Sequence, residues 1–125
     1  MVIVDTSVFV EALRGNRVFA LETIIVAGLA AISATVYLEL LHGVRSAKEL
    51  SLKKFLRTIG IPLPWPSQET CLNIIKKSRS KGIRVGIPDI LIVADAVQNS
   101  ASIITLDKEL ARLAQAVSVA VVPVE

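Results

Sequence analysis

Four acidic residues lie at or near the expected beginnings of helices and follow apolar, strand-like runs: Asp5, Glu39, Asp89 and Asp107. A buried charge without a partner is costly, and four carboxylates gathered at one end of a sheet would repel one another. A divalent cation would relieve that repulsion, and a bound cation can promote phosphodiester chemistry. These residue types and positions therefore predict a cation site, provided that the four side chains meet in space.

Each acid also has a simpler structural interpretation. Asp5 and Asp107 could cap the helices that follow them. Asp89 could favour the positive end of a helix dipole, and Glu39 could lie on an exposed helix face. However, Glu39 and Asp89 are embedded in apolar sequence, which predicts a sheltered site with a partner. A metal ion is the simplest partner for several acids at once, and oxygen ligands favour Mg²⁺ or Mn²⁺.

The composition limits the other possibilities. Of the 125 residues, 53% are hydrophobic, so we expect one compact domain over residues 1–125. A single cysteine, Cys71, and a single histidine, His42, exclude an intrachain disulfide framework and a Cys/His zinc site. The uncharged stretch 23–38 is shorter than the about 20 apolar residues of a membrane span, and no basic leader precedes Asp5. We therefore expect a cytoplasmic protein without a membrane segment or signal peptide.

The formal net charge is +3, and part of the basic charge is concentrated just before Asp89. This stretch is either the solvated end of a helix, where cations complement the dipole, or a patch that contacts phosphate groups. Only 4% of the residues are aromatic, so we do not expect base stacking to dominate if the ligand is a nucleic acid. The stretch contains Lys76, Lys77, Arg79, Lys81 and Arg84.

Strand-like and helix-like segments alternate along the chain, which predicts an α/β fold with a parallel sheet wrapped by helices. Pro62, Pro64 and Pro66 exclude a central strand in residues 60–66, so a strand there must lie at an edge of the sheet. Ligands of such sheets bind at the carboxyl ends of strands, where Asp5 and Asp107 are expected. The expected strands are 2–4, 29–33, 60–66, 102–106 and 117–122, and the expected helices are 8–14, 17–26, 35–44, 47–59, 68–80, 90–98 and 107–116.

Four segments resemble, in order, the motifs of PIN domains, especially those of VapC-type toxins from toxin–antitoxin pairs. The ordered set spans nearly the whole chain, although no one motif is specific by itself. The segments are 2–8 (VIVDTSV), 37–43 (YLELLHG), 87–94 (IPDILIVA) and 103–107 (IITLD).

The resemblance implies a PIN-like domain with a five-stranded parallel sheet of order 3-2-1-4-5. It implies metal-dependent endonucleolytic cleavage of RNA, a homodimer, and silencing by a small antitoxin protein. The acidic quartet of the family corresponds to Asp5, Glu39, Asp89 and Asp107, and Thr6 and Thr105 match hydroxyl positions that support its site.

Three further polar residues near the motifs are interpreted as peripheral. Asp95 and Glu11 each lie six residues after an acid of the quartet, and so point elsewhere around their helices. His42 lies three residues after Glu39 and is expected to be structural.

The leading hypothesis is therefore an endoribonuclease that depends on Mg²⁺ or Mn²⁺ and acts as the toxin of a type II pair. The alternatives are an RNA-processing nuclease of the same fold without an antitoxin, and a non-catalytic module that binds RNA or protein. Apolar stripes on helices 17–26 and 47–59 belong to the core or receive a dimer partner or antitoxin helix. The candidates for RNA contacts are Arg14, Arg45, Lys48, Lys76, Lys77, Arg79, Lys81 and Arg84.

Overall fold

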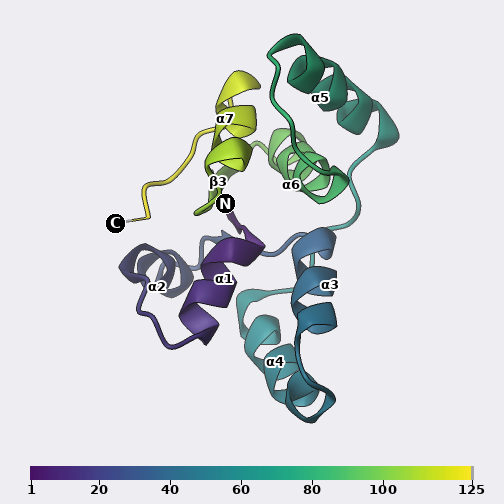
Figure 1. Cartoon of the computed structure of the whole chain (residues 1–125). Helices are drawn as coiled ribbons and strands as arrows, with labels where there is room; N and C mark the ends of the chain where they lie inside the picture. The colour runs from purple at the N-terminus through teal and green to yellow at the C-terminus, as the bar shows by residue number, and fades with distance from the viewer. Residues whose placement is uncertain (125) are drawn as a thin grey trace.

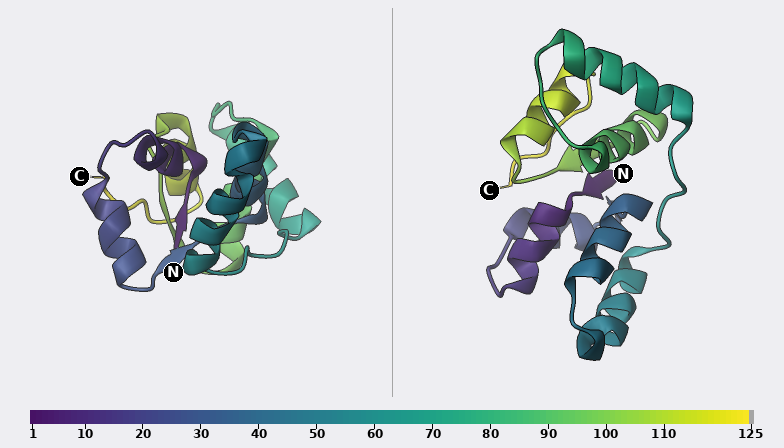
Figure 2. Two further views of the ribbon diagram at one scale, coloured as in Figure 1. Left: turned by 90° about the horizontal axis from the view of Figure 1, so that it is seen from below. Right: turned by 45° about the vertical axis from the view of Figure 1, so that its right-hand side comes forward.

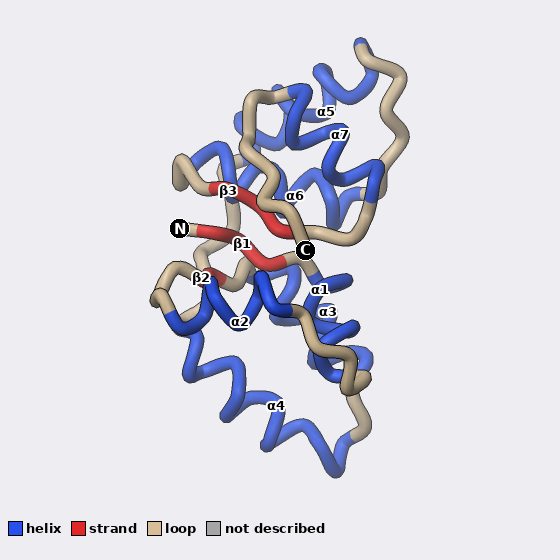
Figure 3. The backbone as a smooth tube through the Cα atoms, turned by 90° about the vertical axis from the view of Figure 1, so that its left-hand side faces the viewer, coloured by secondary structure: helices blue, strands red, loops and turns tan. Residues whose placement is uncertain are grey.

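A short parallel sheet runs through the middle of the molecule, with its strands in the order β2-β1-β3 (Figure 3). The computed structural model describes residues 1–124; Glu125, the last residue of the expected domain, lies outside the described residues. β1 comprises Val2–Val4, β2 comprises Ala30–Ala31 and β3 comprises Ser102–Ile104. The apolar run at the start of the chain therefore forms the central strand.

The parallel register aligns the ends of β1 and β3. Val2 lies opposite Ala30 on one side and Ser102 on the other, and Val4 lies opposite Ile104. Because the two strands end side by side, the residues that follow them, Asp5 and Thr105, emerge at the same edge. Ile3, Val4, Ile103 and Ile104 are fully buried, as expected for strands covered on both faces.

The helices form two groups on either side of the sheet. Figure 1 shows α5, α6 and α7 in its upper half and α1 to α4 in its lower half, and the right-hand view of Figure 2 keeps this division. The bounds are α1 Thr6–Leu13, α2 Phe19–Val26, α3 Ala34–Gly43, α4 Ser46–Ile59, α5 Gln68–Ser80, α6 Ile87–Gln98 and α7 Lys108–Ala116. No helix within residues 1–124 is long and apolar enough to cross a membrane.

The two predicted outer strands are each reduced to a single parallel bridge. Leu63 bridges Ser33 next to β2, and Val121 bridges Ile103 next to β3. In residues 60–66 the alternate prolines lack N–H groups, and the Leu63 N–H donates to Ile32 O at 2.8 Å. The five-stranded sheet is thus a three-stranded sheet in the described residues, with bridges at the outer positions expected from the order 3-2-1-4-5.

The end of α7 explains why no strand forms over residues 117–122. Ser118 has a φ of 63°, in the left-handed region, and the Val119 N–H donates to Ala114 O at 2.8 Å. This turn closes the helix and uses the first residues of the expected strand. Elsewhere the helix bounds depart from the predicted ones by at most a few residues; α6 begins at Ile87 rather than at residue 90, with Pro88 in its first turn.

Candidate active site

Asp5 lies at the junction of β1 and α1, and only 5% of its surface is exposed. Although it occupies the N-cap position of α1, its side chain makes no capping hydrogen bond. Instead its Oδ2 accepts hydrogen bonds from Ser7 Oγ at 2.6 Å and Thr105 Oγ1 at 2.8 Å. The simple capping interpretation of Asp5 is therefore wrong, because the carboxylate is held by hydroxyls from two segments of the chain.

Asp107 follows β3 and caps α7. Its Oδ1 accepts hydrogen bonds from the N–H groups of Glu109 at 2.9 Å and Leu110 at 3.2 Å. Its own N–H donates to Thr105 Oγ1 at 3.0 Å, so Thr105 contacts both Asp5 and Asp107. The capping interpretation of Asp107 is correct, yet Oδ2 has no hydrogen-bond partner among residues 1–124 and stays available to a ligand.

Glu39 projects from α3 toward the first turn of α1. Thr6 Oγ1 donates to Glu39 Oε1 at 2.8 Å, which links the two helices at the edge of the site. Glu39 is exposed, and its neighbour Leu38 has 53% of its surface exposed. The expectation that apolar neighbours shelter Glu39 is therefore wrong, because residues adjacent in a helix lie on different faces.

Asp89 lies in the first turn of α6 and is half-buried. Burial, and to a lesser extent the negative charges of Asp107, Asp5 and Glu39, together raise the pKa of its carboxyl to about 6. Asp107, Asp5 and Glu39 thus lie close enough to Asp89 for their charges to act on its carboxyl. Asp89 itself makes no side-chain hydrogen bond or ion pair within residues 1–124.

No basic side chain neutralises this region in the part of the chain that the structure describes. The ion pairs there join Arg17 to Glu22, Lys53 to Glu49 and Arg112 to Glu109. No acid of the quartet takes part in these pairs, so a nearby Lys or Arg is not the partner of the quartet within the described residues. The excess negative charge is consequently left for a ligand to neutralise.

The donor set suits a hard divalent cation. Carboxylate oxygens are the ligands that Mg²⁺ and Mn²⁺ prefer, and several oxygens of the quartet lack hydrogen-bond donors among the described residues. No three Asp, Glu, His or Cys side chains within residues 1–124 are already close enough to hold an ion in common. The quartet therefore suits such an ion by its charge and its oxygen donors. The carboxylates would have to move closer together to bind one ion in common.

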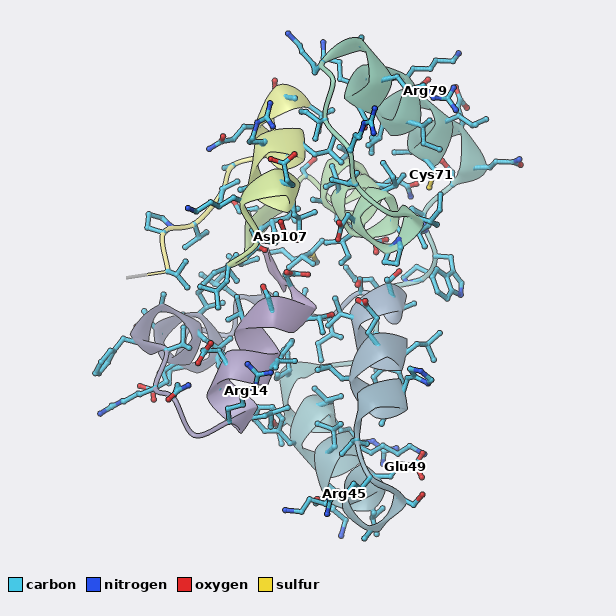
Figure 4. All side chains as sticks on the ribbon, in the orientation of Figure 1. Arg14, Arg45, Glu49, Cys71, Arg79 and Asp107 are labelled. Atoms are coloured by element: carbon cyan, nitrogen blue, oxygen red, sulfur yellow. The ribbon has the colours of Figure 1, made fainter. Side chains whose placement is uncertain are left out.

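The basic residues do not form one patch. All eight candidates for RNA contacts are exposed. Figure 4 shows Asp107 between the two groups of helices, Arg79 at one end of the molecule on α5, and Arg45 at the opposite end. Arg14 directly follows the last residue of α1 and lies on the same side of the molecule as Arg45 (Figure 4). Basic residues thus lie on both sides of the acidic region and not in a single run beside it.

The residues interpreted as peripheral lie outside the acidic site. Asp95 is buried in α6, Glu11 contacts the Asn16 side chain, and His42 is exposed in the last turn of α3. The unexpected member of the site is Ser7, which the sequence analysis did not single out. Its signal was its position two residues after Asp5 in the run Asp5-Thr6-Ser7.

Comparisons with known proteins agree with this architecture. The family model described as the PIN domain matches residues 2–116. The comparison with curated proteins found no match.

Among solved structures, FitAcB from Neisseria gonorrhoeae is 24% identical, with a TM-score of 0.75 over 98% of this chain and 97% of that one. VapBC2 from Rickettsia felis, bound to a DNA fragment from its promoter, is 19% identical, with a TM-score of 0.77 over 98% of both chains. VapBC-1 from nontypeable Haemophilus influenzae is 18% identical, with a TM-score of 0.71 over 98% of this chain and 97% of that one. At these identities the likeness establishes the fold.

Proposed function

The chain belongs to the PIN domain family, and on that premise we propose that it is a metal-dependent endoribonuclease and the toxin of a type II toxin–antitoxin pair. The observation that carries the proposal is the perturbed carboxyl of Asp89. Its pKa is raised by burial and by the charges of Asp107, Asp5 and Glu39, and no cation of the chain pairs with it within residues 1–124. Perturbed acids of this kind gather at catalytic sites.

In this proposal the four acids have different roles. Asp5 and Asp89 would hold a Mg²⁺ or Mn²⁺ ion, directly or through water, and Asp107 would complete the acidic pocket. When bound, the ion supplies neutralising charge at the phosphate and lowers the pKa of a coordinated water. Glu39, kept in place by Thr6, orients the attacking water through its second carboxylate oxygen. Attack by water on phosphorus leaves a 5′-phosphate and a 3′-hydroxyl.

The basic residues would bind the RNA backbone on either side of the pocket. Arg14, Arg45 and Lys48 belong to the group of α1 to α4, and the run 76–84 belongs to α5 and the loop after it. Their exposure and their lack of ion pairs in the described part of the chain leave them free for phosphates. Such contacts provide affinity with little sequence information.

An antitoxin is the partner that the surface supports. Between α1, α2 and α4 lies an apolar hollow of about 420 Å³, whose lining includes Phe9, Leu13, Leu21 and Phe55. A second hollow of about 380 Å³ shares Leu13 and Phe55 with it. A continuous apolar groove of this kind accepts the apolar face of a helix. One of the similar structures is a toxin–antitoxin complex from Klebsiella pneumoniae, 16% identical over the whole of this chain.

The proposal includes a homodimer in the cytoplasm. Large hydrophobic side chains remain exposed away from the groove, and a second copy of the chain would cover them. They include Leu38 on α3, Ile61 and Trp65 in the loop before α5, and Ile87 at the start of α6.

The decisive experiment is incubation of the purified chain with a panel of defined RNAs in Mg²⁺, Mn²⁺ or EDTA. We expect cleavage with either ion, none in EDTA, and ends that carry a 5′-phosphate. Asp5→Asn should lose the activity while keeping its fold. Cleavage by Asp5→Asn at the wild-type rate would overturn the catalytic assignment, and binding of RNA without cleavage in any metal would favour a non-catalytic module.

The toxin assignment has its own test. Expression of the chain should arrest growth, and Asp89→Ala should abolish the arrest. Co-expression of a small protein encoded beside the gene should also relieve it. Metal-dependent cleavage without toxicity would instead favour an RNA-processing nuclease of the same fold.

A further inference from the structure

Ser7 has an environment that helix capping does not explain. The residue lies in the first turn of α1 and is half-buried. Its Oγ donates to Asp5 Oδ2 at 2.6 Å and accepts from the N–H of Leu106 at 3.0 Å. Leu106 is 99 residues away in the sequence, so this hydroxyl joins the start of α1 to the loop after β3.

Thr105, which directly follows β3, repeats the same pattern. Its Oγ1 donates to Asp5 Oδ2 at 2.8 Å and accepts from the N–H of Asp107 at 3.0 Å. A hydroxyl has one proton to donate. Each hydroxyl donates its proton to Asp5. Neither therefore has a proton left to donate to the other across the 3.4 Å between Ser7 Oγ and Thr105 Oγ1.

The two hydroxyls together make a clamp on one carboxylate oxygen. Oδ2 of Asp5 receives two donors, whereas Oδ1 receives none within residues 1–124. Rotation of the carboxylate would break both bonds, and hydrogen bonds to a charged acceptor are stronger than those between neutral groups. The clamp therefore fixes the plane of the buried Asp5 carboxylate and leaves Oδ1 as its free oxygen.

The same clamp also sets Asp5 relative to Asp107. The two hydroxyls take their second hydrogen bonds from the consecutive N–H groups of Leu106 and Asp107, which form the loop that carries the Asp107 side chain. A shift of this loop would thus move the two hydroxyls that hold the Asp5 carboxylate. Asp89 has no comparable anchor among the described residues.

We propose that Ser7 is a positioning residue for the cation site: with Thr105 it holds Oδ2 of Asp5, so that Oδ1 is the oxygen that would be free for an ion. This inference rests on the proposed function, because it assumes that the acidic pocket binds a divalent cation. Hydrogen-bond partners that orient metal ligands typically change metal affinity by about 10- to 100-fold when they are removed. Ser7 takes no part in the reaction itself and acts through Asp5.

The test measures Mn²⁺ binding by calorimetry, without RNA, for the wild type and three variants. We expect Ser7→Ala to weaken Mn²⁺ binding by about tenfold or more, and Ser7→Thr, which keeps the hydroxyl, to restore most of the affinity. Ser67→Ala is the matched control, because the Ser67 hydroxyl caps the start of a different helix, α5, by accepting from Thr70 N. It should lower the melting temperature and leave Mn²⁺ affinity unchanged.

The outcomes separate this inference from the proposed function. If the wild type binds Mn²⁺ and Ser7→Ala binds it equally well, the positioning role is overturned and the nuclease proposal stands. An equal loss of affinity in Ser67→Ala would also overturn the role, because it would mark a general effect of stability. A wild type that does not bind Mn²⁺ overturns both. Should Ser7→Ala fail to fold, Ser7→Cys replaces it, since a thiol is a weak donor and should give a partial loss.

Discussion

Thr6 Oγ1 donates a hydrogen bond of 2.8 Å to Glu39 Oε1, and so connects residues 33 positions apart in the sequence. The next residue, Ser7, donates to Asp5 at 2.6 Å. The junction of β1 and α1 therefore provides one acid of the quartet and the hydroxyls that hold two of them. Asp89 is the member without a hydrogen bond among the described residues, and it is also the one whose pKa is raised to about 6.

Removal of the Thr6 hydroxyl should reduce RNA cleavage. Thr6→Val keeps the shape of the side chain but loses the donor to Glu39, which then samples other rotamers at the exposed edge of the site. We expect a decrease in single-turnover cleavage of about tenfold, the lower end of the effect of lost outer-shell partners. Thr6→Ser retains the donor and should stay near the wild-type rate. Equal rates for Thr6→Val and the wild type would show that Glu39 needs no anchor.

Addition of Mn²⁺ should raise the melting temperature. The four acids repel one another in the metal-free protein, and a ligand that binds only the native state stabilises it by about 2.7 kcal/mol at 100 times its dissociation constant. The measurement is a thermal melt in EDTA and in millimolar Mn²⁺. Asp5→Asn should show little or no increase, and an unchanged melt of the wild type would contradict the cation site.

Much of the fold was predictable because its signals are local. The apolar run before Asp5 is long enough for a buried strand and too short for a helix, and Ser67 and Pro88 mark helix starts by their own chemistry. The outer strands were not predictable in length. The prolines of residues 60–66 predicted an edge position, but no local signal showed that only Leu63 would pair.

The residues of the candidate site were likewise predictable only where their signals are local in the sequence. The quartet was predicted from residue type and from positions at or near helix starts after apolar runs, and the parallel register brings the segments of Asp5 and Asp107 together. Ser7 was missed because the N–H group of Leu106, which donates to it, lies 99 residues away in the sequence and comes close only after folding. Glu39 was expected to be sheltered for the opposite reason: apolar neighbours in sequence say little about the helix face on which a residue lies.

The stability of the metal-free protein should depend on Asp89 in a defined pH range. Its pKa rises from 3.8 to about 6 on folding, through burial first and the other acids second. A raised pKa of an acid favours the native state below the unfolded value and loses that contribution as the pH rises through about 6. Asp89→Asn should therefore be more stable than the wild type at pH 8, by about 1 kcal/mol after allowance for solvent screening of a partly exposed group.

Urea unfolding in EDTA at pH 8 and at pH 4 checks this expectation. The difference between Asp89→Asn and the wild type should shrink at the acidic pH, because the wild-type carboxyl is then protonated and neutral like the amide. A difference of the same size at both pH values would point to a packing effect instead of a charge effect.

A second acid, Asp95, is buried outside the acidic site and has a separate effect. Only 1% of its surface is exposed, and its Oδ2 has no hydrogen-bond partner in residues 1–124. It lies on α6, which makes its most extensive helix contact with α5. Burial, and after it the charge of Asp95, raises the pKa of the Cys71 thiol on α5. Burial raises the pKa of Asp95 from 3.8 to about 7.

Asp95→Asn should consequently stabilise the protein at alkaline pH. The protonated acid contributes fully below pH 3.8, and the contribution is lost as the pH rises through about 7. At pH 8 the wild type must carry a buried charge without a partner, so we expect the amide variant to be more stable by about 2 to 4 kcal/mol. The measurement is urea unfolding at pH 8, with pH 4 as the condition where the gain should vanish. Because Asp95 lies outside the acidic pocket, Mn²⁺ should raise the melting temperature of this variant as much as that of the wild type; a smaller rise would place Asp95 in the cation site after all.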